Sequence, residues 1–124
     1  MQDPSHYSPL ALAFFGDAVF ALLVREQLLL QANRPAGQLH KLATEQVNAK
    51  AQAEFAREIL PQLNEEEAAV FRRGRNAKPG TIPKSCTATE YALATGLEAL
   101  LGWLWLKGDF DRVRQLFPLT KTLK

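Results

Sequence analysis

Residues 10–24 form an apolar run of fifteen residues in which Asp17 carries the only charge. Ser8 and Pro9 precede the run and are typical of a helix N-cap and a first helical position, so we expect a helix over residues 9–31. Apolar residues at helical spacing share the face of Asp17, namely Leu10, Ala13, Phe14, Ala21 and Val24. An unpaired carboxylate in such surroundings is costly, and the fold must therefore bring a cation, hydrogen-bond donors or a cleft to Asp17.

The rest of the chain also carries helical signals. Apolar residues recur every fourth position over residues 38–60, and two pairs further along resemble capping boxes. These pairs are Asn64 with Glu67 and Thr87 with Glu90. The signals predict helices over residues 38–60, 65–75, 87–107 and 110–117. Residues 1–7 are expected to form a flexible arm, and residues 76–86, with two prolines and a glycine, are expected to form a loop.

The absence of strand-like alternation predicts an all-α protein, a single compact domain of about five main helices over residues 1–124. A net charge of +2 does not by itself indicate a nucleic-acid partner. The single cysteine, Cys86, excludes an internal disulfide framework and favours a reducing cytoplasm. Asp17 interrupts the first apolar run and Arg25 soon follows it, which argues against a signal peptide or a membrane span.

A second apolar run, residues 92–106, also contains a single charged residue, Glu98. The economical interpretation is that Asp17 and Glu98 face each other and share a cation. Carboxylate oxygens with few other ligands suit Mg²⁺, which keeps several of its waters. The alternative is a pair of partly exposed structural acids, each paired with a nearby arginine or lysine.

Basic residues gather over positions 72–84, at the expected end of the helix over residues 65–75 and in the loop that follows it. The candidates for contact with phosphates are Arg72, Arg73, Arg75, Asn76, Lys78 and Lys84. The alternative for the arginines is a solvated helix end that compensates the helix dipole, and for Asn76 it is helix termination. No aromatic residue lies in this segment, which favours a duplex backbone over splayed single-strand bases. An acidic pair beside a phosphate-binding edge suggests metal-dependent phosphodiester cleavage.

Three segments resemble the ribonuclease III catalytic domain. Residues 14–19, FFGDAV, resemble the family signature, and residues 97–102, LEALLG, resemble its second acidic motif. Residues 71–78, FRRGRNAK, followed by GTIPK at 80–84, are similar to the smaller Mini-ribonuclease III branch. The end of the chain at Lys124 matches that branch, which lacks the double-stranded-RNA-binding domain.

This resemblance implies a fold, a partner and a chemistry. The fold is an all-helical homodimer whose two acidic sites lie along one RNA-binding valley, with Phe14 at the dimer interface; the alternative for Phe14 is an ordinary core contact. The substrate is double-stranded RNA, and the branch is associated with maturation of large-subunit (23S) ribosomal RNA. Asp17 and Glu98 would hold Mg²⁺ as the catalytic acids.

The acidic set is reduced relative to full-length ribonuclease III. That family places acids where Leu10, Ala13 and Thr95 stand here, as in the similarly reduced Mini branch. Two other functions remain open: a catalytically silent duplex-RNA-binding or ribosome-assembly protein on the same fold, and a helical module that binds an acidic protein. The retained Asp17 and Glu98 favour the enzyme, because a pure binder has no reason to keep this pair.

Overall fold

The computed structural model describes residues 3–78 and 80–118, and all regular secondary structure over these residues is helical, with no strand. Six α-helices follow one another along the chain: α1 (Pro9–Gln31), α2 (Ala36–Gln46), α3 (Ala49–Ile59), α4 (Glu65–Arg75), α5 (Ala88–Leu106) and α6 (Phe110–Leu116). Two short 3-10 turns, η1 (Pro4–His6) and η2 (Leu60–Gln62), precede α1 and α4. The all-α prediction is confirmed.

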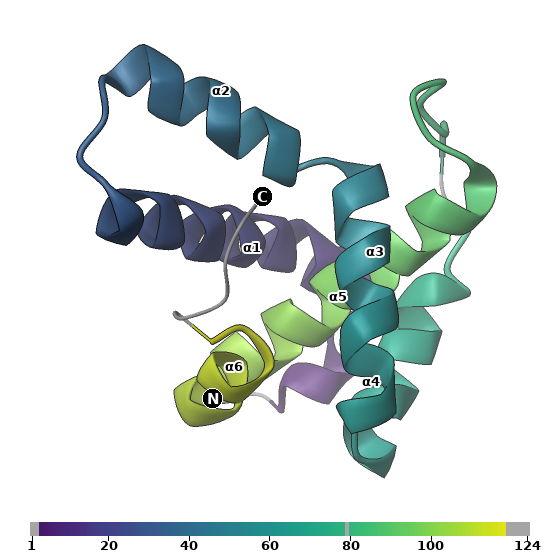
Figure 1. The fold of residues 1–124 in the computed structure, drawn as a ribbon. Coiled ribbons are helices and arrows are strands. Elements are labelled where there is room, and N and C mark those ends of the chain that lie inside the picture. Colours follow the sequence, from purple (N-terminus) through teal and green to yellow (C-terminus); the bar gives the residue numbers. More distant parts are fainter. Residues whose placement is uncertain (1–2, 79, 119–124) are drawn as a thin grey trace.

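Helix α5 is the centre of the fold. It is apolar on every side, and α1, α3, α4 and α6 all pack against it (Figure 1). Leu97, Leu100, Leu101 and Leu104 of α5 are completely buried. Glu98 therefore stands on the most enclosed helix of the chain, and its position depends on which helices cross α5 at that point.

The predicted helix over residues 38–60 is wrong in one respect, because the structure divides it into α2 and α3. The backbone of Asn48 is extended, with φ −149° and ψ 162°, and its side chain accepts a hydrogen bond of 2.9 Å from the amide of Ala51. Asn48 thus acts as an N-cap inside the expected helix and starts α3 in a new direction. Helix α2 lies alongside α1, whereas α3 crosses α5 (Figure 1).

The other helix boundaries follow the capping signals. Ser8 caps α1 through a 3.1 Å bond from the amide of Ala11, and both predicted capping boxes are present at the starts of α4 and α5. Gly108 follows the end of α5 with φ +78°, a left-handed conformation that suits glycine. Local capping chemistry therefore sets most helix ends.

Helices α1 and α5 cross at glycine contacts beside the two carboxylates. A Cβ atom on Gly16 would overlap the carbonyl oxygen of Glu98, and one on Gly102 would overlap the carbonyl oxygen of Leu12. Only glycine permits this backbone approach. Since Gly16 directly precedes Asp17, the crossing brings the Asp17 segment onto the turn of α5 that carries Glu98.

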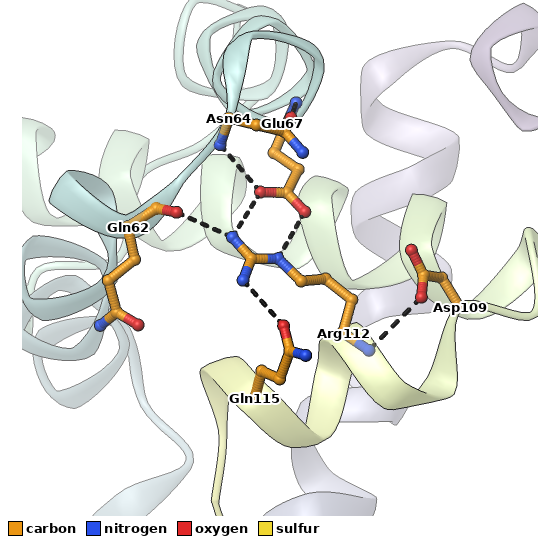
Figure 2. Close-up of polar contacts among 6 residues, drawn as sticks. All are labelled: Gln62, Asn64, Glu67, Asp109, Arg112 and Gln115. Carbon is orange, nitrogen blue, oxygen red and sulfur yellow. Dashed lines mark hydrogen bonds and ion pairs between the residues drawn. The ribbon is translucent and has the colours of Figure 1, made fainter.

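A buried ion pair ties α6 to the start of α4. Glu67 is only 2% exposed and accepts bonds of 2.7 and 2.8 Å from Arg112, which also donates to the carbonyl oxygen of Gln62 (Figure 2). The Arg112 guanidinium lowers the pKa of Glu67 below its ordinary value. Glu67 thus serves both as a capping-box residue and as the anchor of α6.

The described part of the segment before α1 contains a short helical turn. Residues 1 and 2 of the expected flexible arm lie outside the described residues, but Pro4–His6 forms a 3-10 turn in which Pro4 is buried. Residues 76–86, apart from residue 79, form the expected loop between α4 and α5. Among the described helices, none combines the length and the apolarity needed to cross a bilayer.

Candidate active site

An open cleft of about 230 Å³ lies between α1 and α5. Its lining comes from Leu10, Ala13, Phe14, Asp17, Tyr91, Thr95 and Glu98. The two isolated carboxylates of the apolar runs therefore do meet, as their pattern in the sequence predicts. The cleft also contains all three positions at which full-length ribonuclease III carries further acids.

The two carboxylates differ in environment. Asp17 is exposed rather than enclosed by apolar neighbours, so the expected desolvation of this residue is wrong. The reason is that its face of α1 borders the open cleft. Glu98 is the half-buried member of the pair, and burial, reinforced by the neighbouring Asp17 carboxyl, raises the pKa of Glu98 to about 8.

The raised pKa of Glu98 predicts a pH-dependent stability. Between its ordinary pKa of 4.5 and about 8, the folded protein holds a proton on Glu98 that the unfolded chain has lost. The stability that this proton contributes is complete below pH 4.5 and is lost as the pH rises through about 8.

We therefore expect the Tm of the metal-free protein to decrease as the pH is raised from 5 to 8.5. The decrease should be about 4 °C for each kcal/mol by which the free energy of unfolding falls. The Tm of Glu98→Gln should decrease by less over the same pH interval, because glutamine has no proton to lose at this position. The other titrating groups are common to both proteins and cancel in the comparison, which calorimetry can make. Equal pH dependence in the two proteins would contradict the raised pKa.

The chemistry of the cleft suits a hard divalent cation. Two carboxyl groups lie close together and neither has a cationic partner among the described residues, so the pair has no counterion when both groups are ionised. No cluster of three or more histidine, cysteine, aspartate or glutamate side chains that could hold a metal occurs in the described part of the chain. A cation here would thus have two protein carboxylates and a largely aqueous shell, which fits Mg²⁺ better than zinc.

The positions of the missing acids carry no replacement carboxylate. Leu10 and Ala13 contribute apolar surface, and the Thr95 hydroxyl donates a 2.9 Å bond to the carbonyl oxygen of Tyr91. The hydroxyl of Thr95 still has lone pairs that can accept a hydrogen bond from water in the cleft. The site therefore relies on Asp17 and Glu98 for its negative charge.

A second hollow, of about 520 Å³, lies at the start of α1 and the end of α4. Its lining comes from Pro9, Ala69, Arg72, Arg73, Asn76 and Ala77. Pro9 of this hollow and Leu10 of the acidic cleft are consecutive residues of α1, so the basic end of α4 and the acidic cleft adjoin at the start of this helix. A phosphate backbone that entered the acidic cleft could continue over this basic surface.

Of the remaining candidates for phosphate contact, Arg75, Asn76, Lys78 and Lys84, only Asn76 lines this hollow. Asn76 is the C-cap of α4, and its side-chain oxygen accepts a 3.3 Å bond from Nε of Arg75, so a structural role as helix terminator is visible. Lys78 and Lys84 are exposed in the loop and do not line the basic hollow. Arg72, Arg73 and Asn76 are therefore the members that the fold brings together.

Phe14 is the most exposed large apolar side chain in the described part of the chain, at 82%. The alternative of an ordinary core contact is therefore wrong for the single chain. Phe14 stands on the rim of the acidic cleft, only three residues before Asp17. Leu22, Leu29 and Leu30 of α1 are also about half exposed or more. Apolar surface of this kind commonly marks a protein–protein contact.

Sequence reasoning overlooked Gln52. Its amide Nε2 donates a 3.2 Å hydrogen bond to Oε2 of Glu98, and the contact opposes the rise in the pKa of Glu98. A glutamine on an amphipathic helix is ordinarily assigned to the solvent face. The available signal was its spacing from Ala56 and Ile59, four and seven positions on, which places Gln52 on their buried face of α3.

Comparisons with known proteins identify the family of this chain. The family model described as the ribonuclease III domain matches residues 10–109. A Mini-ribonuclease 3 of Thermoanaerobacter is 48% identical over 91% of this chain and 80% of the relative, and one of Brevibacillus brevis is 43% identical over 93% and 86%. A crystal structure of a Fusobacterium nucleatum protein superposes with a TM-score of 0.84 at 36% identity, covering 94% of this chain and 93% of the other. The chain therefore belongs to the ribonuclease III family, in its Mini-ribonuclease 3 branch.

Proposed function

We propose that this protein is a magnesium-dependent endoribonuclease that cuts double-stranded RNA at the cleft between α1 and α5. Its family membership makes it an endoribonuclease of the ribonuclease III type. The observation that carries the finer proposal is the pair Asp17 and Glu98, two uncompensated carboxylates in one open cleft beside the basic end of α4.

The roles follow from the positions of the side chains. Asp17 and Glu98 would hold Mg²⁺, which supplies activation of a water and stabilisation of the leaving oxygen. Asp17, exposed on the cleft wall, offers its oxygens to solvent and ligand without rearrangement. Glu98 must give up its proton to act as an anionic ligand, so its raised pKa makes cation binding stronger as the pH rises towards 8.

The basic hollow would hold the RNA backbone. Arg72 and Arg73 present guanidinium groups that can contact phosphate oxygens with two hydrogen bonds each. Such contacts position a duplex without reading its sequence. Arg75, Asn76, Lys78 and Lys84 would extend this surface along the α4–α5 loop.

The active form would be a homodimer with Phe14 at its interface. An aromatic ring with 82% of its surface exposed is costly to leave in water, and a second copy would cover it. Since Phe14 lines the cleft, the partner would also close one side of the acidic site. The proposed substrate is a precursor of large-subunit (23S) ribosomal RNA in the cytoplasm, which the Mini-ribonuclease 3 relationship supports.

A silent duplex-RNA binder is the second candidate, because Leu10, Ala13 and Thr95 replace acids in the cleft. Glu98→Gln separates the two functions. We expect it to lower kcat on a short RNA duplex by about a hundredfold, because loss of one anionic ligand removes a few kcal/mol of transition-state stabilisation. The Kd for the duplex should change by less than about twofold, since phosphate contacts lie elsewhere. Gel analysis and fluorescence anisotropy measure the two quantities. A folded variant that loses binding in parallel with activity would contradict the assignment of Glu98.

The loop lysines predict a salt effect. If Lys78 and Lys84 contact phosphates, replacing both by alanine should flatten the slope of log K against log salt by about one to two units. Binding to unrelated duplexes should weaken alike, and Tm should hardly change because both side chains are exposed. Anisotropy titrations from low to moderate salt test this. Identical slopes would remove the loop from the RNA site and favour the module that binds an acidic protein.

A further inference from the structure

Gln52 is one of the few polar side chains enclosed in the described core. Only 4% of Gln52 is exposed, and the other buried polar residues in the described part of the chain are Gln27, Glu67 and Thr95. Its side chain is hydrogen-bonded to Glu98, across the contact between α3 and α5. A buried amide is tolerated only where its hydrogen bonds are made, so this contact explains why a glutamine stands here.

The break between α2 and α3 places Gln52 at this contact. Asn48 caps α3 four residues earlier, and the new helix direction presents Gln52, Ala53, Ala56 and Ile59 to the core. Ala53 and Ala56 are completely buried, which lets α3 pack closely on α5. A helix that continued unbroken from α2 would not carry this face across α5 (Figure 1).

The chemistry of an amide suits this position. The Nε2 side of the amide faces Oε2 of Glu98, and a donor at this place suits the ionised form of the carboxylate, which can only accept hydrogen bonds. An arginine or lysine here would neutralise the carboxylate and compete with a cation. An amide holds one carboxylate oxygen in place but leaves the charge of Glu98 available to the cleft.

We propose that Gln52 is a positioning residue for the acidic cleft: its amide holds Oε2 of Glu98 and so orients the carboxylate for a divalent cation shared with Asp17. This inference rests on the proposed function. When a hydrogen bond from a neighbouring residue to a metal-binding side chain is removed, metal affinity or activity typically falls by about 10–100-fold.

The test uses Gln52→Met, which keeps the size of the side chain and removes the donor. Gln27→Met is the matched control, because Gln27 is equally buried at 5% but donates to the carbonyl oxygen of Pro118, outside the cleft. Mn²⁺ binding without RNA is followed by electron paramagnetic resonance of the free ion. Cleavage of a short RNA duplex with Mg²⁺ gives kcat and KM, and calorimetry gives Tm.

We expect Gln52→Met to weaken Mn²⁺ binding and to lower kcat by about tenfold each, with KM within about twofold of the wild type. Gln27→Met should leave the Mn²⁺ Kd and kcat unchanged, whatever it does to Tm. Wild-type Mn²⁺ affinity and kcat in a folded Gln52→Met protein would overturn the proposal, as would equal losses in both variants.

A second variant covers failure of Gln52→Met to fold. Gln52→Asn keeps the amide but shortens the side chain by one methylene, so the donor no longer reaches Glu98 at 3.2 Å. It should show the same loss of Mn²⁺ affinity, and unchanged affinity would again overturn the proposal. The wild type separates failure of the role of Gln52 from failure of the proposed function. A wild type that neither binds Mn²⁺ nor cuts the duplex would overturn the proposed function itself, and this inference with it.

Discussion

Asp17→Asn is expected to abolish RNA cleavage, with kcat reduced by about 10²–10⁴-fold. The substitution keeps the size of the side chain and removes the more exposed of the two charges that would hold the cation. Loss of an anionic ligand removes several kcal/mol of transition-state stabilisation, and each 1.36 kcal/mol is a factor of about ten in rate. Initial rates on a short RNA duplex with saturating Mg²⁺ measure the effect.

The fold should survive this change. Asp17 is exposed and has no cationic partner among the described residues, so no ion pair is lost, and its removal also lowers the cost of ionising Glu98. We therefore expect an equal or higher Tm. Asp111→Asn, a change at an exposed acid on α6, is the control and should keep the wild-type rate. Retention of most of the wild-type rate by folded Asp17→Asn would contradict the role of Asp17.

Phe14→Asp is expected to convert the proposed dimer into a monomer. In a dimer with Phe14 at the interface, the new carboxylate would be buried against apolar surface at a cost of several kcal/mol. A loss of that size weakens the dimer Kd by about a thousandfold or more. Because Phe14 is 82% exposed in the single chain, the monomer itself should remain folded. Sedimentation velocity at micromolar concentration measures the mass.

Phe110→Asp is the matched control for this experiment. Phe110 is also an exposed aromatic residue, at 49%, and it contacts Trp105 on α5 rather than lying at the acidic cleft. We expect it to keep the wild-type mass. A dimer mass in Phe14→Asp would move the interface away from Phe14 and its cleft.

Local signals account for the parts of the fold that could be predicted. The capping residues at Ser8, Asn64 and Thr87 act within three residues of the helices they start, so their chemistry is legible in the sequence. The break at Asn48 was overlooked because apolar residues continue at helical spacing on both sides of it. When a capping residue lies inside a continuous apolar periodicity, the periodicity predicts one helix, and only the tertiary packing shows that the helix is broken there.

Long-range packing decides the features that sequence reasoning could not supply. The pairing of Asp17 with Glu98 was predicted because each is alone in an apolar run, but which of them is desolvated depends on the crossing of α1 and α5 at Gly16. The contact of Gln52 with Glu98 joins residues 46 positions apart, and neither residue type by itself indicates it. Glu67 was predicted as a cap, but not its pairing with Arg112, 45 positions on.

The central claim is that the Asp17–Glu98 cleft cuts RNA duplexes with a divalent cation. The most direct measurement incubates the wild-type protein with a short, end-labelled RNA duplex, and separately with its unannealed strand, in Mg²⁺ or in excess chelator. We predict discrete fragments from the duplex in Mg²⁺, and intact RNA in the other three reactions. A duplex that is bound but stays intact in Mg²⁺, or one that is cut equally well in chelator, would contradict the account.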